Sequence, residues 1–363
     1  MTKIIKAKET MSARERVLKT FNSEKTDRVT IGYEANPLIH GRFLEALGVT
    51  GEELPYALGM DYLGIGIPYT GKPLFEEMPD RRTDPIDGFR MRWAENLSGG
   101  GYWDFCDFPL QDAEDDDIDK YPVANPDDFD YEGLAGQIEK KRDFALHIGH
   151  PGVPDIINSM GRIMGMEDIL CNLQIGHEPT LNLILRRAQS SLGVFERVLE
   201  KYKGEIDFIW LGEDLGTQIA PMLNLEVYRN RIKPIHKMFA DMAKCYNIPS
   251  LMHTCGSSSW AYEDFIELGI SGVDTLQPEA ANMSPEYLKK SFGGRLAFRG
   301  CISTAGPLAY GSTEETRSVC METLEIMKQG YGYHFAPTHQ IQDNTPVENL
   351  LAMYQAVHDF GSY

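Results

Sequence analysis

The chain has 363 residues and a formal net charge of −19, with 42% hydrophobic and 25% charged residues. This composition is ordinary for a globular protein, and the length allows one large α/β domain or two smaller ones. The negative charge argues against nucleic acid or an anionic membrane as a partner, because both are themselves negative. No apolar run reaches the roughly 20 residues of a membrane span, and the N-terminus lacks the apolar core of a signal peptide. We therefore expect a cytoplasmic protein.

The spacing of the cysteines does not indicate disulfides, and the spacing of the acidic residues does not indicate a calcium site. The six cysteines do not follow a disulfide framework, so we expect thiols, most of them buried. Acidic residues gather at 112–121, where the sequence reads DAEDDDIDKY. We expect a solvated loop there, because the glycine turn of a calcium-binding loop is missing.

Short apolar segments alternate with amphipathic helical stretches along the chain. After an N-terminal helical extension, eight such segments predict strands, at residues 29–34, 62–68, 144–149, 207–212, 249–254, 272–277, 295–300 and 333–338. Residues 224–247 place their apolar side chains near one face of a helix. Residues 312–330 predict a helix with Ser312 or Thr313 as N-cap and Gly330 at its end.

The last helix is predicted at residues 345–361, with Thr345 as N-cap and Pro346 in the first helical position. Eight strand–helix units are what a (β/α)8 TIM barrel requires. The surplus length lies mainly at about 70–130, where a β-hairpin insertion precedes the acidic segment. We therefore expect a single α/β domain over residues 1–363. A doubly wound open sheet is the rival fold, but no G-x-G-x-x-G follows a predicted strand.

The carboxyl ends of the predicted strands carry most of the chemically useful side chains. Barrel enzymes place their catalytic groups at these ends, which meet at one mouth. The side chains expected there are Glu34, Tyr69, His150, Glu213, Asp214, His253, Cys255, Gln277, Cys301 and His339.

His253 and Cys255 are alternate residues leaving one predicted strand, so both side chains can point the same way. Such a pair offers two ligands that suit Zn²⁺. A catalytic zinc takes three protein ligands, and either His339 or Cys301 could supply the third, with Glu213 or Asp214 nearby.

Each of these side chains also has a structural explanation. His253 and Cys255 could be a packed histidine and a buried thiol, and Cys301 could be a second inert thiol. His339 could be a hydrogen-bonded histidine that binds no metal. His150 and His334 are expected to be structural residues.

Several stretches together resemble the uroporphyrinogen decarboxylase superfamily, in the same order along nearly the whole chain. They include DRVTIGYE, DYLGIGIP, LGEDLGTQ, HTCGS, GVDTLQP, FGGRLAFRGCIS and GYHFAPTHQIQDNTPVENLLAMY. The superfamily includes the decarboxylase and the cobalamin-dependent methyltransferases that work with corrinoid proteins. The resemblance implies the (β/α)8 barrel and is compatible with a homodimer.

The resemblance favours the methyltransferase branch. The decarboxylases carry an arginine-rich loop after the first strand, whereas this chain has Glu34 there and only Arg42 nearby. The methyltransferases hold zinc with an H-x-C pair, which His253 and Cys255 match, and a later cysteine at the end of the last strand. Here that later position reads Thr338–His339, so His339 is expected to take the place of the cysteine.

The function implied is a corrinoid-linked methyltransferase, with zinc-assisted transfer between a corrinoid protein and a small methyl ether, a methyl amine or a thiol. Zinc can hold a thiol as thiolate, or act as a Lewis acid on a methylated heteroatom. A neutral imidazole at position 339 would make the ion more electrophilic, which favours the demethylating direction. Asp214, Glu213, Tyr69 and Gln277 are the candidates for supporting the site and orienting the substrate.

Two other functions stay open. One is a metal-free decarboxylase or lyase that uses Asp214 or Glu34 with His339 as acid–base groups on a small carboxylated substrate. The other is a ligand-binding relative that transfers no methyl group.

Overall fold

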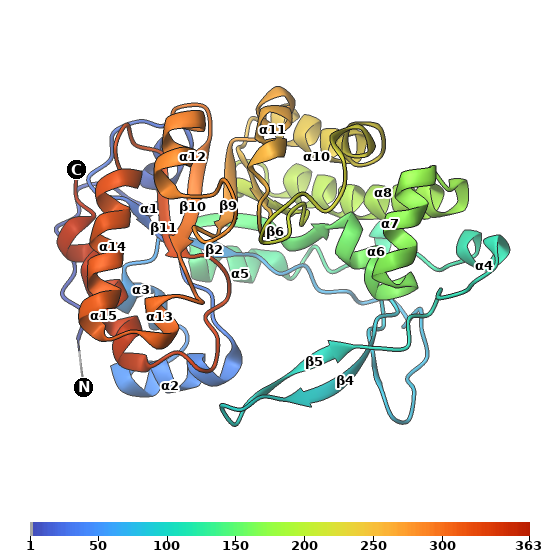
Figure 1. The fold of residues 1–363 in the computed structure, drawn as a ribbon, viewed down its shortest axis with the longest axis horizontal. Helices are drawn as coiled ribbons and strands as arrows, with labels where there is room; N and C mark the ends of the chain where they lie inside the picture. Colours follow the sequence, from blue (N-terminus) through green and yellow to red (C-terminus); the bar gives the residue numbers. More distant parts are fainter. Residues whose placement is uncertain (1–2) are drawn as a thin grey trace.

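The structure, a computed structural model, describes residues 3–363 and contains eight parallel strands in a barrel surrounded by helices (Figure 1). The strands are β1 (Thr30–Ile31), β2 (Tyr62–Gly64), β6 (Ala145–Pro154), β7 (Phe208–Gly212), β8 (Ser250–His253), β9 (Gly272–Leu276), β10 (Ala297–Ile302) and β11 (Tyr333–Pro337). Their order in the sheet is β1-β11-β10-β9-β8-β7-β6-β2. The eight predicted strands and the predicted (β/α)8 barrel are confirmed.

The seam between β1 and β2 closes through the residue that precedes β2, Asp61. Its backbone N–H donates to the carbonyl of Ile31 at 3.0 Å, and its carboxylate accepts the N–H of Ile31 at 2.7 Å. The same carboxylate is fully buried and pairs with Arg16 and with Arg28, at 2.7 Å from the latter. A charged side chain therefore completes the barrel where the two short strands share no ladder.

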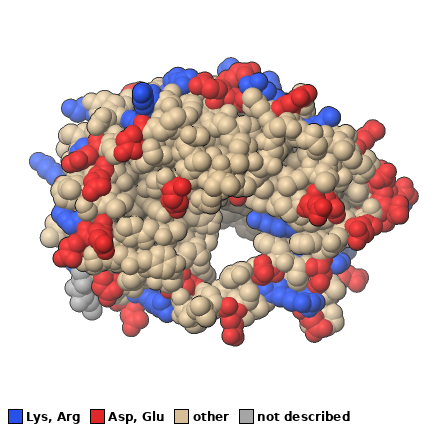
Figure 2. Space-filling view, viewed as in Figure 1, with Lys and Arg blue, Asp and Glu red and all other residues tan. Residues whose placement is uncertain are grey.

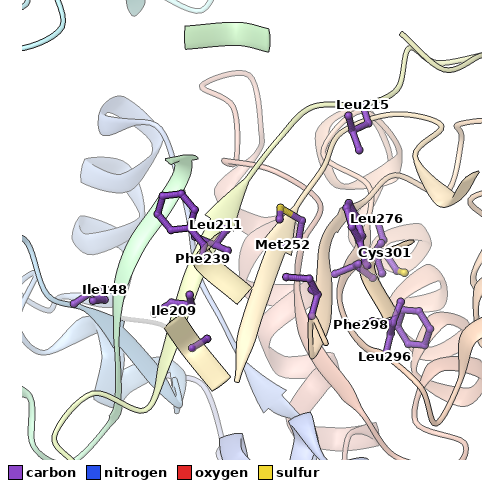
Figure 3. Packing of buried hydrophobic residues seen from close by; sticks show 14 of the residues in the cluster. Ile148, Ile209, Leu211, Leu215, Phe239, Met252, Leu276, Leu296, Phe298 and Cys301 are labelled. Atoms are coloured by element: carbon purple, nitrogen blue, oxygen red, sulfur yellow. The ribbon is translucent and has the colours of Figure 1, made fainter. Parts of the chain in front are cut away.

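Side chains of the strands alternate between the inside of the barrel and the layer under the helices, as strand geometry requires. Ile148, Ile209, Leu211, Met252 and Phe298 belong to the large outer core, which Figure 3 shows around β7, β8 and β10. A smaller inner cluster consists of Val17, Phe21, Tyr62, Ala145, Phe208, Trp210, Leu251 and Ala297. The first two of these residues come from helix α1 (Ala13–Phe21), so the N-terminal helical extension packs against side chains inside the barrel.

The longer helices are α1 (Ala13–Phe21), α2 (Pro37–Leu47), α5 (Leu134–Lys141), α6 (Ile156–Met164), α7 (Met166–Ile175), α8 (Glu178–Lys201), α10 (Lys233–Cys245), α12 (Pro285–Phe292), α14 (Thr313–Met327) and α15 (Val347–Phe360). Shorter helices are α3 (Leu54–Leu58), α4 (Asp115–Asp119), α9 (Leu225–Val227), α11 (Tyr262–Leu268) and α13 (Pro307–Tyr310). None of the helices within residues 3–363 is long and apolar enough to cross a bilayer.

Several helix boundaries differ from the sequence-based predictions. The predicted helix at 224–247 is interrupted by a π-helical turn at Tyr228–Ile232. Ser312 is the N-cap of α14 and forms a capping box with Glu315. The prediction for α15 is wrong by one residue, because Pro346 is the N-cap and Thr345 precedes it. The predicted acidic loop contains the short helix α4, whose first turn carries three aspartates that favour a helix N-terminus.

The insertion forms a hairpin that reaches over one side of the barrel. β3 (Arg82–Thr83), β4 (Arg90–Glu95) and β5 (Gly101–Phe105) pair as an antiparallel sheet, which confirms the predicted hairpin. At its tip, Asn96 donates to Asp343 at 3.0 Å, and Arg42 of α2 donates to the carbonyl of Ser98 at 3.3 Å. The hairpin thus touches the body again at its far end and frames an opening, visible in Figure 2.

Asp61→Asn should lower the free energy of unfolding by about 3–5 kcal/mol, because it leaves Arg16 and Arg28 buried without their shared anion. Urea unfolding measures the change. The control is Asp116→Asn, which removes an ion pair with Lys120 that lies in solvent and should change stability by less than about 1 kcal/mol. Equal losses in the two variants would contradict the role given to Asp61.

Candidate metal centre

Three metal-binding side chains meet at the mouth of the barrel. His253 is the last residue of β8, Cys255 follows two residues later, and His339 follows the end of β11. The Cys255 Sγ lies 3.4 Å from His253 Nε2. One ligand atom from each residue can be chosen so that all three lie within 4.8 Å of one another.

The distance between Cys255 Sγ and His253 Nε2 suits a tetrahedral zinc ion. With Zn–S near 2.3 Å and Zn–N near 2.0 Å, a tetrahedral angle separates sulfur and nitrogen by about 3.5 Å. The separation between Cys255 and His253 is 3.4 Å. Two imidazoles and one thiolate give three protein ligands and leave a fourth position open, as in catalytic zinc sites.

The ring of His253 is held by its other nitrogen. Nδ1 lies 3.0 Å from Asp274 Oδ2 and 2.6 Å from the hydroxyl of Thr275, both on β9. With Nδ1 taken up in this way, Nε2 faces Cys255 and is the atom available to a metal. A carboxylate behind the ligating histidine is the usual arrangement in zinc sites, where it fixes the ring and raises its basicity.

A buried arginine holds Asp274 in turn. Arg299 of β10 is fully buried, donates to Asp274 Oδ1 at 2.6 Å and packs over the ring of Trp210 at 4.5 Å. Burial opposes ionisation of Asp274, but Arg299 and His253 outweigh it and lower the pKa of Asp274 to about 2. Burial likewise would lower the pKa of His253, yet hydrogen bonds to Asp274 and Cys255 raise it well above its usual value. A metal ion must therefore displace a proton from His253.

Asp214 and Gln277 hold the loop that carries Cys255. Asp214 accepts the backbone N–H of Cys255 at 2.8 Å, and its Oδ1 lies 3.7 Å from His253 Nε2. Asn158 of α6 donates to its second oxygen at 2.9 Å. Gln277 accepts the N–H of Gly256 at 2.6 Å. Both predicted residues thus lie beside the metal group.

Glu34 and His339 are two of the titratable groups that solvent reaches at the mouth. Glu34 Oε2 lies 3.4 Å from Arg299, and burial raises its pKa despite this cation. The protein atoms around His339, and then His253, lower the pKa of His339. Glu34 therefore keeps its proton to a higher pH than an ordinary glutamate, and His339 loses its proton at a lower pH than an ordinary histidine.

Glu213 lies on the opposite side of the strand end from Asp214. Its carboxylate is fully buried and accepts the backbone N–H groups of Ile156 and Ile157 at 2.8 and 2.9 Å, at the start of α6. His236 is its third neighbour, at 3.3 Å. Glu213 anchors α6 to β7 and does not face the metal group, which differs from the role expected for it.

Three other expected residues also lie outside the metal group. Cys301 is buried in the core beside Leu276 and Phe298, as Figure 3 shows, so it is not placed as the third ligand. The hydroxyl of Tyr69 donates to the carbonyl of Lys72. The ring of Tyr69 packs against Phe129 of the insertion at 5.2 Å. His150 lines a different cavity, between β6 and α8.

Sequence reasoning did not single out Asp274, Thr275, Arg299 or Asn158. A usable signal was present, because Asp274 and Arg299 are charged residues inside otherwise apolar strands. Charged side chains are fully buried only when they are paired, so two such strands predict an ion pair inside the barrel. Thr275 has a φ of 62°, an unusual conformation for a β-branched residue, and its hydroxyl contacts His253.

The family model described as Uroporphyrinogen decarboxylase (URO-D) matches residues 210–360. The match covers less than half of the chain, and over these residues the chain is similar to that family. The resemblance expected from the sequence is therefore confirmed over the segment that contains His253, Cys255 and His339.

Comparison with solved structures supports the barrel fold through a methyltransferase. This chain is similar to a methyltransferase from Methanosarcina mazei, with a TM-score of 0.66, 16% identity, and coverage of 97% of this chain and 99% of that one. A xylanase 10B from Thermotoga maritima aligns with a TM-score of 0.39 and 12% identity, over 90% of this chain and 86% of that one. No curated protein matches the sequence.

Glu213→Gln should flatten the pH dependence of stability. Burial raises the pKa of Glu213 from 4.5 to about 8, so the folded chain keeps a proton that the unfolded chain loses. The wild-type free energy of unfolding should therefore fall as the pH rises from about 5 to 8, since folding takes up a proton in this range. Urea unfolding at several pH values measures this slope.

In Glu213→Gln this part of the slope should be lost, because glutamine does not ionise. The exposed control Glu226→Gln should keep the wild-type slope. An unchanged slope in Glu213→Gln would show that this carboxyl does not retain a proton in the folded chain.

Proposed function

We propose that this protein is a corrinoid-linked methyltransferase. In this proposal His253, Cys255 and His339 hold one zinc ion, and a methyl group moves between a small methyl ether, methyl amine or thiol and a corrinoid carried by a partner protein. The observation that carries the proposal is the convergence of the three ligand atoms within 4.8 Å at the barrel mouth. The similarity in fold to a methyltransferase supports it.

A bound zinc ion would supply Lewis acidity toward a methylated heteroatom, or would hold a substrate thiol in its thiolate form. The residues of the chain prepare the site for this role. Asp274 and Thr275 keep Nδ1 of His253 engaged, so that Nε2 faces the metal position. Asp214 fixes the backbone of Cys255. A neutral imidazole from His339 leaves more positive charge on the site than a thiolate would, which favours removal of methyl from a donor.

Glu34 supplies a group that can hold a proton beside this site. When the bond between methyl and heteroatom breaks, the electron pair stays on the heteroatom, which needs a positive charge or a proton. The raised pKa of Glu34 keeps its carboxyl protonated to a higher pH than an ordinary glutamate. We therefore assign Glu34 as the candidate proton donor to the departing oxygen or nitrogen.

Decarboxylation of a substrate with many carboxylates is less well supported. Such a substrate needs cations at the mouth, and Arg299 is already engaged by Asp274 and by the hydroxyl of Tyr62, at 2.6 and 2.7 Å. Arg42 donates its hydrogen bonds to backbone carbonyls of the hairpin and of Asp343. The carboxylate of Asp214, whose pKa is lowered in spite of its burial by His253 and by hydrogen bonds, would also repel carboxylates.

Zinc content and methyl transfer test the proposal together. The wild type should bind about one zinc per chain and transfer methyl from a methoxylated substrate to a reduced corrinoid protein. His253→Ala, Cys255→Ala and His339→Ala should each lose most of the zinc and the activity, because each removes one of the three ligands.

Cys245→Ala removes an exposed thiol and should keep both properties. Cys301→Ala separates the two candidates for the third ligand and should keep its zinc, since Cys301 lies in the core. A wild type that binds no zinc after reconstitution would contradict the proposal. If the protein binds zinc but transfers no methyl group from ethers or amines and none to thiols, the metal centre stands and the proposed reaction is wrong.

A further inference from the structure

A cavity lies beside the barrel, and none of the three metal-binding side chains lines it. It has a volume of about 330 Å³, opens to solvent, and is bounded by the end of β6, by α6 and α8, and by the insertion. This volume is at the lower end of the roughly 300–1,000 Å³ of small-molecule sites. Its walls are mostly aliphatic or aromatic, with Ile67, Val153, Met160, Ile184 and Phe195 among the residues that line it.

The polar groups of the cavity are few and carry no net charge. Arg187 of α8 pairs with Asp87 of the insertion at 2.8 Å, so these two charges balance each other. His150 accepts the N–H of Gly152 through Nδ1, which leaves Nε2 for another partner. Surrounding protein atoms lower the pKa of His150, so its ring is neutral at neutral pH.

We propose that this cavity is a second binding site, distinct from the metal centre, for a small, uncharged and mainly apolar molecule that carries one hydroxyl or carbonyl group. The apolar walls exclude a strongly hydrated ligand, because burying an unpaired charge there would be costly. The polar group of the ligand would be met by His150, and its body would lie between α6 and α8.

Helix α6 forms one wall of the cavity and also contacts a residue that supports the metal centre. In the segment from Pro154 to Met160, Ile156 and Ser159 line the cavity. Asn158, from the same turn of α6, points the other way and donates to Asp214, which holds the backbone of Cys255. A ligand in the cavity therefore touches the helix that supports the metal site, without reaching the metal ligands.

The metal centre and the cavity are formed by different parts of the chain. The three metal-binding side chains lie within residues 210–360, the part that matches the family model. The residues that line the cavity lie between Ile65 and Phe195, outside that match. The cavity is thus a feature of the part of this chain that the family model does not describe.

Calorimetric titration with three probes of one shape tests the charge preference. 2-Naphthol is uncharged, 2-naphthoate is an anion and 2-naphthylmethylammonium is a cation. We expect 2-naphthol to bind at least about 10-fold more tightly than either ion, because the lining offers no unbalanced charge. Equal binding of the three probes, or tighter binding of an ion, would overturn the proposal.

Filling the cavity from α8 tests its location. Ala188→Phe and Ser191→Phe should each weaken 2-naphthol binding about 10-fold or more, because both positions line the cavity. Leu185→Phe, at an exposed position of the same helix, should leave it unchanged. The melting temperature of each variant shows whether it has folded, and two filling positions keep the test valid if one variant does not.

Cys255→Ser separates this proposal from the proposed zinc function. It removes one metal ligand and should leave 2-naphthol binding unchanged, since Cys255 does not line the cavity. If Cys255→Ser abolishes the binding while the filled variants keep it, the probe binds at the metal centre and the second site does not exist. If no variant changes the binding, the cavity is likewise not the site.

Discussion

The candidate metal centre depends on one buried ion pair inside the barrel, between Arg299 and Asp274. A guanidinium without solvent exposure is costly unless its charge and donors find partners. Here Asp274 accepts from Nη1, the hydroxyl of Tyr62 accepts from Nε, and the ring of Trp210 covers the cation. The pair keeps Asp274 ionised, and the ionised carboxylate holds Nδ1 of His253. The orientation of the His253 ring thus depends on an ion pair that lies below the metal ligands, inside the barrel.

The residues of the candidate metal centre and the elements that could select a ligand come from different parts of the chain. The strands β8, β9, β10 and β11 supply His253, Asp274, Arg299 and the approach to His339, all within the segment that matches the family. The hairpin and the residues that line the cavity lie before this segment, between Ile65 and Phe195. α6 is the element that links them, because it lines the cavity and also contacts the carboxylates of Glu213 and Asp214.

Most of the fold could be predicted from the sequence, because apolar segments and helix caps are local patterns. The metal group could be predicted as well, since alternate residues at a strand end share a side and since the carboxyl ends of parallel strands meet. The pairing of Asp274 with Arg299 could not be predicted from such local patterns, because the two residues lie on different strands and meet only in the folded barrel.

The misplaced residues have local physical reasons. Glu213 and Asp214 are neighbours, so their side chains leave the strand on opposite sides. Cys301 follows an irregularity in the pairing of β9 and β10, and it has a φ of 66°, so counting from Arg299 gives the wrong side. Tyr69 lies well beyond β2, which ends at Gly64, and belongs to the root of the insertion. None of these deviations is visible in the apolar pattern.

X-ray absorption spectroscopy of the zinc-loaded protein tests the central claim most directly, because it reports the donor atoms of the metal. The account predicts one sulfur at about 2.3 Å and two or three nitrogen or oxygen donors at about 2.0–2.1 Å. The imidazole scattering should fall by about half in His339→Ala. Two sulfur donors would place a second cysteine in the site, and a shell of oxygen donors alone would mean that His253, Cys255 and His339 do not hold the metal.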